Sequence, residues 1–255
     1  MKKLIAVILT TFALALPAMT AAQRTPVVVE LFTSEGCSSC PSADALLSDL
    51  QKTQPIPGAQ IIALGQHVDY WNHGGWADPY SSAQFSRRQN DYAQKFGRNE
   101  VYTPQMIVNG SAEFVGSDKG RAAQEITQAV RLPQAHVQAT RTRDGKLFVR
   151  VEGLPVPGTA DVVLAITEDG LVSHVAGGEN SGRTLAHSAV VRELRVIGTA
   201  QPGIVFTASP MIAAERGWSP ARLHAVVFVQ ERATRRIVGA AEVSLLGNYS
   251  ATEQN

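Results

Sequence analysis

Two stretches near the start of the chain carry the clearest hydrophobic patterns. Residues 27–32 form a mainly apolar run rich in β-branched side chains, which is typical of a buried strand. After it, Ala43, Leu46, Leu47 and Leu50 recur at the spacing of one helix face. The sequence therefore predicts a strand followed directly by a helix.

The pattern continues with alternating strands and helices up to residue 131. Asn109-Gly110 is a strong hairpin signal, and Asp118 is a plausible helix cap. The predicted order is β-α-β-α-β-β-α, which favours a mixed sheet covered by helices. The remaining elements are strand 60–66, a polar-aromatic loop at 67–79, helix 80–96, strands 103–108 and 112–115, and a helix from 118 to 130.

From about residue 133 the chain changes to strands with little helix. Asp144-Gly145 and Asp169-Gly170 each lie between two strand-like segments, so each predicts a hairpin turn. Many short strands of this kind predict an antiparallel β-sandwich. The expected strands are 135–141, 146–152, 161–167, 171–176, 184–197, 203–208, 222–231 and 237–246.

The N-terminus has the pattern of a secretory signal peptide. Lys2 and Lys3 precede an apolar core at 4–16, and small residues follow up to a cleavage site expected between Ala22 and Gln23. The core is too short for a membrane span, so we expect a periplasmic or secreted protein with no span after cleavage. The predicted organisation is a signal peptide at 1–22, an α/β domain at 23–132, a β-sandwich-like domain at 133–248 and a flexible tail at 249–255.

Composition narrows the range of partners. The 255 residues are 44% hydrophobic, enough for substantial cores, and their formal net charge is only +1. A nearly neutral chain gives no reason to expect a nucleic-acid partner.

The chain has only two cysteines, Cys37 and Cys40, and they lie where the first strand ends and the first helix begins. A helix N-terminus stabilises a thiolate, and a Cys-x-x-Cys spacing favours thiol–disulfide exchange. Cys37 is the expected exposed nucleophile, and Cys40 would resolve the mixed disulfide. Ser38 and Ser39 are positioned to hydrogen-bond the thiolate or to cap the helix.

Two other interpretations of the cysteine pair remain open. A purely structural disulfide would contribute little stability, because stabilisation grows with loop length and this loop encloses two residues. A structural zinc site needs four ligands, and the chain has no further cysteine.

Auxiliary residues are predicted around the pair. Glu35 could relay a proton, although a solvated turn is an equally good interpretation. His67 and Asp69 follow the second strand, at the sheet edge where α/β sites collect, and His67 could serve as a base or simply as a structural histidine. Trp71, with its aromatic neighbours, could form a lip for a peptide or pack the loop.

Residues in the later part of the chain are also candidates. Arg183 and His187 lie four apart on a predicted strand and would share a face, so with Arg192 they could line a cleft that receives an anion or an unfolded chain. Surface salt bridges are the alternative for these residues.

The whole mature chain resembles an exported thioredoxin-like family of unknown function. The resemblance rests on residues 28–41, 67–71, 102–105 and 178–183, with His187 and Arg192. It implies a thioredoxin fold for 23–132, with Thr103 presenting its backbone to a substrate before a cis Pro104. The sequence departs from ordinary thioredoxin because Gly36, and no Trp, precedes Cys37.

The predicted function is a periplasmic thiol–disulfide oxidoreductase with no cofactor beyond the Cys37–Cys40 disulfide. Its substrate would be a protein or small-molecule thiol or disulfide, and its redox partner is undefined. One alternative is a copper-binding or chaperone-like protein with Cys37, Cys40 and His67 or His73 as ligands, since thiolates suit Cu(I). Another is a binding module with an incidental disulfide.

Overall fold

The computed structural model describes residues 24–212 and 215–246. The predicted signal peptide at 1–22 and tail at 249–255 lie outside these residues. In chain order the elements are β1 (Thr25–Thr33), α1 (Cys40–Thr53), β2 (Ala59–His67), α2 (Ala83–Lys95), β3 (Gln105–Val108), β4 (Ala112–Val115), α3 (Lys119–Ala129), β5 (His136–Arg141), β6 (Leu147–Glu152), β7 (Ala160–Glu168), β8 (Leu171–His174), β9 (Thr184–His187), β10 (Val190–Ala200), β11 (Phe206–Ala208), a short 3-10 helix η1 (Pro220–Arg222), β12 (Leu223–Glu231) and β13 (Ile237–Ser244).

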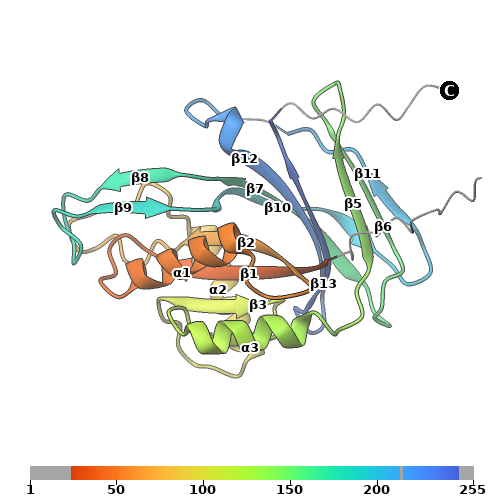
Figure 1. Cartoon of the computed structure of the whole chain (residues 1–255), viewed down its shortest axis with the longest axis horizontal. Helices are drawn as coiled ribbons and strands as arrows, with labels where there is room; N and C mark the ends of the chain where they lie inside the picture. Colours follow the sequence, from red (N-terminus) through yellow and green to blue (C-terminus); the bar gives the residue numbers. More distant parts are fainter. Residues whose placement is uncertain (1–23, 213–214, 247–255) are drawn as a thin grey trace, which may run out of the picture.

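A mixed sheet of eight strands runs through the molecule in the order β13-β12-β7-β10-β2-β1-β3-β4 (Figure 1). β1 pairs in parallel with β2 and antiparallel with β3. The predicted hairpin at Asn109-Gly110 is confirmed, because it joins the antiparallel strands β3 and β4. The predicted β-α-β-α order in a mixed sheet is thus confirmed for the start of the chain.

Successive residues of β1 face opposite sides of the sheet, as strand geometry requires. Val27, Val29 and Leu31 pack into the core beneath α1 and α3. Val28 and Phe32 belong to apolar clusters on the other face, with side chains of α2. Helices therefore cover both faces of the first half of the sheet.

Glu30 lies on the α2 face of β1, and its charge is balanced inside the core. Arg88 of α2 forms two hydrogen bonds with its carboxylate, at 2.6 and 3.0 Å, and Tyr92 forms another at 2.5 Å. Gln66 donates at 2.6 Å, and Gln230 of β12 joins the network through the Tyr92 hydroxyl. Burial would raise the pKa of Glu30, but the charge and hydrogen bonds of Arg88 hold it below its ordinary value.

Strands from the later part of the chain extend the same sheet. β10 meets β2 through one parallel pair, Val190 with Gly65, and β7, β12 and β13 follow antiparallel. The small sheet β11-β6-β5 packs on one face of these strands and encloses a second core. The predicted antiparallel strands are confirmed, and so is the turn at Asp144-Gly145. The strands β7, β10, β12 and β13, which follow the boundary expected near residue 133, lie in the same sheet as β1 to β4.

The predicted hairpin at Asp169-Gly170 is wrong. β7 is buried along most of its length, and the long apolar strands β10 and β12 occupy both of its edges. β8 is short and pairs with β9 instead. The single strand predicted at 184–197 is split at Ala189, which has a positive φ of 49°. The β8–β9 hairpin therefore leaves the large sheet and runs beside α1 (Figure 1).

Among the residues described, none of the helices has the length and apolar character needed to cross a membrane.

Candidate active site at the Cys37–Cys40 disulfide

Cys37 and Cys40 form a disulfide between the end of β1 and the start of α1. Ser39 is the N-cap residue of α1, but its side chain makes no capping hydrogen bond. Its hydroxyl lies 3.4 Å from Cys37 Sγ, and because a disulfide sulfur carries no proton, the hydroxyl is the donor. From the sequence, Ser39 is expected either to hydrogen-bond the sulfur or to cap the helix. The structure shows the hydrogen bond to the sulfur.

The expected exposure of Cys37 is wrong: the residue is 1% exposed and Cys40 is fully buried. The loop between β8 and β9 covers them. Asn180 Nδ2 donates to the carbonyl oxygens of Glu35 and Cys37, at 2.9 and 2.8 Å, and Glu179 accepts from the Ser38 backbone N–H at 2.9 Å. We call residues 177–180 the cap.

The glycines of the cap allow its backbone to lie close to the segments around Gly75 and Gly36. A Cβ placed on Gly177 would lie 2.4 Å from the carbonyl oxygen of Gly75, a distance that no side chain tolerates. The neighbouring Gly178 packs 3.6 Å from the Cα of Gly36 by the same measure. Three chain segments far apart in sequence thus meet backbone to backbone around the residue that precedes Cys37.

Glu35 is completely buried and has two side-chain partners. Trp76 Nε1 donates to one carboxylate oxygen at 2.7 Å, and His187 Nε2 lies 3.0 Å from the other. A carboxylate is an acceptor, so His187 donates to it through Nε2. His187 Nδ1 is buried and has no hydrogen-bond partner among the described residues.

A second ionisable pair lies against the first. His67 Nδ1 and Asp78 Oδ2 are 2.7 Å apart, and Asp78 also accepts the Glu35 backbone N–H at 2.8 Å. Burial alone would lower the pKa of His67, but the charge and hydrogen bond of Asp78 raise it. Burial would raise the pKa of Asp78, and His67 lowers it overall. Both shifts favour the ion pair, with His67 protonated and Asp78 ionised.

The two pairs are in direct contact through their rings. The centroids of His67 and His187 are 4.8 Å apart, and Tyr80 packs edge-on against both rings. Asp44 of α1 adds a third carboxyl group whose pKa is raised by burial, partly offset by the charges of the two histidines. A buried acid–base cluster thus lies beneath the disulfide segment.

Thr103 and Pro104 form the other side of the site. Their peptide bond is cis, as the family resemblance implies. Trp71 Nε1 donates to Thr103 Oγ1 at 2.8 Å, and the Trp71 side chain also lies against Gly36, 3.2 Å from a Cβ placed there. Trp71 therefore connects the residue before Cys37 with the residue before the cis proline.

The remaining predicted residues have supporting positions. Asp69 accepts a hydrogen bond from Ser86 of α2 and so fixes the loop after β2. Arg183 donates to Asn180 Oδ1 at 2.7 Å and so fixes the orientation of the Asn180 side chain in the cap. Arg192 pairs with the buried Glu168 at 3.6 Å, so its salt bridge is not at the surface.

Asp44, Asp78, Glu179 and Asn180 were missed from the sequence. Asp78 and Asn180 stand in loops among glycines and prolines, where such residues usually make turns. The signals in the sequence are indirect: Asp78 lies in the polar-aromatic loop at 67–79, and Glu179 and Asn180 lie in the 178–183 segment on which the family resemblance rests.

The copper-binding alternative finds no assembled ligand set. Within 24–212 and 215–246, no group of three or more His, Cys, Asp or Glu side chains is arranged to hold a metal ion. Cys37 and Cys40 form a disulfide, and His67 is hydrogen-bonded to Asp78.

Comparisons with known proteins agree with this architecture. A family model described as "Protein of unknown function (DUF1223)" matches residues 28–230. The chain is similar to an X-ray structure of an Agrobacterium tumefaciens protein from a structural genomics consortium, with 27% identity, a TM-score of 0.71, and coverage of 92% of this chain and 100% of that chain. No curated protein matches.

Proposed function

Because the chain belongs to the DUF1223 family, whose function is unknown, we propose a function from the site itself: a thiol–disulfide oxidoreductase that uses Cys37 and Cys40. The observation that carries the proposal is the Ser39 hydroxyl directed at Cys37 Sγ, in a disulfide that closes a loop of two residues. Such a loop contributes little to folding, whereas a hydroxyl donor stabilises the Cys37 thiolate after reduction.

The proposed reaction transfers two electrons. A substrate thiolate attacks Cys37 Sγ, the Cys37–Cys40 bond breaks, and Cys40 leaves as a thiolate that is then protonated. A second substrate thiolate attacks the mixed disulfide and releases Cys37, so that the substrate becomes a disulfide and the protein a dithiol. The reverse sequence reduces a substrate disulfide.

Each turnover takes up or releases protons, and the Glu35–His187 pair is suited to hold them. Glu35 lies two residues before Cys37 and fixes the His187 ring through Nε2. His187 Nδ1 is buried and has no hydrogen-bond partner among the described residues, so it is available for proton transfer. We assign Glu35 and His187 as positioning and proton-holding residues, with His67 and Asp78 orienting them.

The thioredoxin-like interpretation of residues 23–132 forms part of the proposal. The parallel β1–β2 pair, with α1 between the two strands, and the antiparallel pairing of β1 with β3 support it. Thr103 would present its backbone to the substrate. Because the cap buries both cysteines, exchange requires the β8–β9 loop to move away from Ser38 and Cys37.

Export to the periplasm also belongs to the proposal, since it supplies an oxidising compartment. The support is the sequence pattern at residues 1–22. Fractionation of cells expressing the full chain should place the protein in the periplasmic extract, about 22 residues shorter by mass.

The decisive experiment measures exchange directly. The oxidised protein is equilibrated in glutathione buffers and its redox state is read by thiol alkylation and mass spectrometry, with Cys37→Ser/Cys40→Ser as the control. We expect a potential above about −300 mV, and Cys40→Ser should trap a mixed disulfide through Cys37. A lower potential with no trapped adduct would overturn the proposal.

Burial of both cysteines favours one alternative, a static crosslink that holds the cap segment in place. In that case Cys37→Ser/Cys40→Ser would lower the stability of the protein, and the disulfide would not equilibrate with glutathione.

A further inference from the structure

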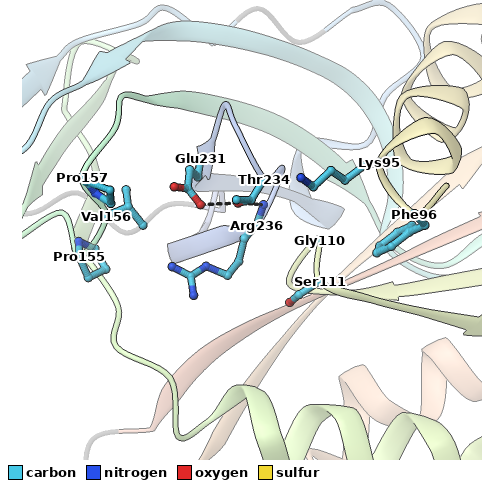
Figure 2. Close-up of a pocket in the computed structure, with 10 residues that line it drawn as sticks. All are labelled: Lys95, Phe96, Gly110, Ser111, Pro155, Val156, Pro157, Glu231, Thr234 and Arg236. Atoms are coloured by element: carbon cyan, nitrogen blue, oxygen red, sulfur yellow. Dashed lines mark hydrogen bonds between the residues drawn. The ribbon is translucent and has the colours of Figure 1, made fainter.

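A separate cavity lies at the opposite end of β1 from the disulfide. Its volume is about 540 Å³, and it is bounded by the end of α2, the β3–β4 turn, the loop before β7 and the β12–β13 hairpin (Figure 2). The turn residue Asn109 accepts from the backbone N–H of Val28, near the start of β1, whereas Cys37 follows its end. A volume of this size suits a small organic ligand.

Arg236 distinguishes this cavity. Figure 2 shows its guanidinium extending into the space between Pro155 and Ser111. Its Nε is buried, and no described residue forms a hydrogen bond or ion pair with the guanidinium. The other arginines of the β12–β13 hairpin are paired, Arg232 with Asp161 and Arg235 with Asp91. A buried guanidinium N–H without a partner is costly, so an acceptor is expected there.

The other charges at the cavity set the charge of the ligand. Lys95 uses its ammonium group for one hydrogen bond, to the carbonyl oxygen of Ala233 at 3.1 Å, and keeps further donors. Glu231 is the one carboxylate lining the cavity, and Thr234 donates to it. Two cations against one carboxylate leave a charge of +1, which matches a monoanion better than a phosphate dianion.

The remaining wall is apolar. Phe96 closes one side, and Pro155, Val156 and Pro157 form the other. An apolar surface of this kind stabilises a bound hydrocarbon group, because both are removed from water. The planar fork of an arginine can pair with both oxygens of a carboxylate.

We propose that this cavity binds a monocarboxylate with an apolar body, its carboxylate held by Arg236 and assisted by Lys95. Two sources share this chemistry, namely a free aryl or alkyl carboxylic acid and the C-terminal carboxylate of an apolar peptide. The site is independent of the proposed redox reaction.

The test is a titration of the full chain by NMR or calorimetry. The probes are 4-phenylbutyrate, acetyl-Leu-Phe with a free carboxylate, and the amide of each. We expect saturable binding of at least one carboxylate, with a Kd on the order of 1 mM or tighter. The corresponding amide should bind at least about tenfold more weakly, because it loses the charge-assisted pair. The tighter carboxylate identifies the source.

Two arginine variants complete the test. Arg236→Gln should weaken binding at least about tenfold, and Arg236→Lys, which keeps the charge but loses the fork, should weaken it less. Arg232→Gln is the matched control, because Arg232 is exposed on the same hairpin and its partner is Asp161. Equal affinity for acid and amide, absence of saturable binding, or unchanged binding in a folded Arg236→Gln protein would overturn the proposal.

Discussion

Removal of the Asn180 amide should open the cap. In Asn180→Ala, the carbonyl oxygens of Glu35 and Cys37 each lose a buried hydrogen bond, of 2.9 and 2.8 Å. Each such bond contributes about 0.5–1.5 kcal/mol net, so the closed cap loses about 1–3 kcal/mol. An equilibrium shifted by this amount changes about 5- to 150-fold.

The rate of disulfide reduction reports this shift. If a small thiol reacts only with the open form and closure is fast, then the rate follows the open population. Asn180→Ala should therefore be reduced by dithiothreitol about 5- to 150-fold faster than the wild type. Asn90→Ala is the control, because Asn90 is exposed on α2 and bonds only within that helix.

Two results would refute this reasoning. One is a rate of reduction equal to that of the wild type. The other is an increase that matches, in free energy, the loss of global stability measured by urea unfolding, because reduction would then proceed through the unfolded chain. We expect the increase to exceed the global loss.

Three further predictions concern the core, the cap and the histidine pair. Arg88→Ala leaves Glu30 buried without its ion-pair partner, so urea unfolding should show a loss of about 3–5 kcal/mol, whereas Arg87→Ala on the exposed face should change stability by less than about 0.5 kcal/mol. Gly177→Ala brings a Cβ to within 2.4 Å of the Gly75 carbonyl oxygen and should speed reduction, whereas Gly158→Ala, which meets nothing within 4 Å, should not; equal rates would contradict the packing argument. Because the pKa of His67 is raised in the folded state, its contribution to stability is complete below the ordinary value of 6.5 and is lost as pH rises through the folded value. Because the pKa of Asp78 is lowered, its contribution is complete above 3.8 and is lost as pH falls through the folded value. The stability of the wild type should therefore fall more steeply as pH rises above 6.5 than that of His67→Gln, as followed by urea unfolding at each pH; parallel profiles would show that the ion pair does not form.

The first half of the fold could be predicted because its local signals agree. The apolar run of β1, the helical spacing in α1 and the Asn109-Gly110 turn each specify one structure and pack together in the way they imply. The position of Cys37 and Cys40 at a strand–helix junction follows from the same signals.

The burial of the site could not be predicted, because it depends on pairings between distant residues. Asp169-Gly170 looks like a hairpin turn, but the edges of β7 are taken by β10 and β12, since these longer strands bury more apolar surface. β8 therefore pairs with β9, and this pairing brings Asn180 to Cys37 and His187 to Glu35. No local pattern in 171–187 encodes this outcome.

The pairing of Gly65 of β2 with Val190 of β10 joins the two halves into one sheet. It bears on how the chain could be divided. A fragment ending near residue 132 would expose the free edge of β2, an unpaired parallel strand prone to aggregation. The same fragment would lose Gln230 from the Glu30 network, and would lack Asn180 and His187. The cysteine motif is thus encoded in the first forty residues, but its surroundings are a property of the entire chain.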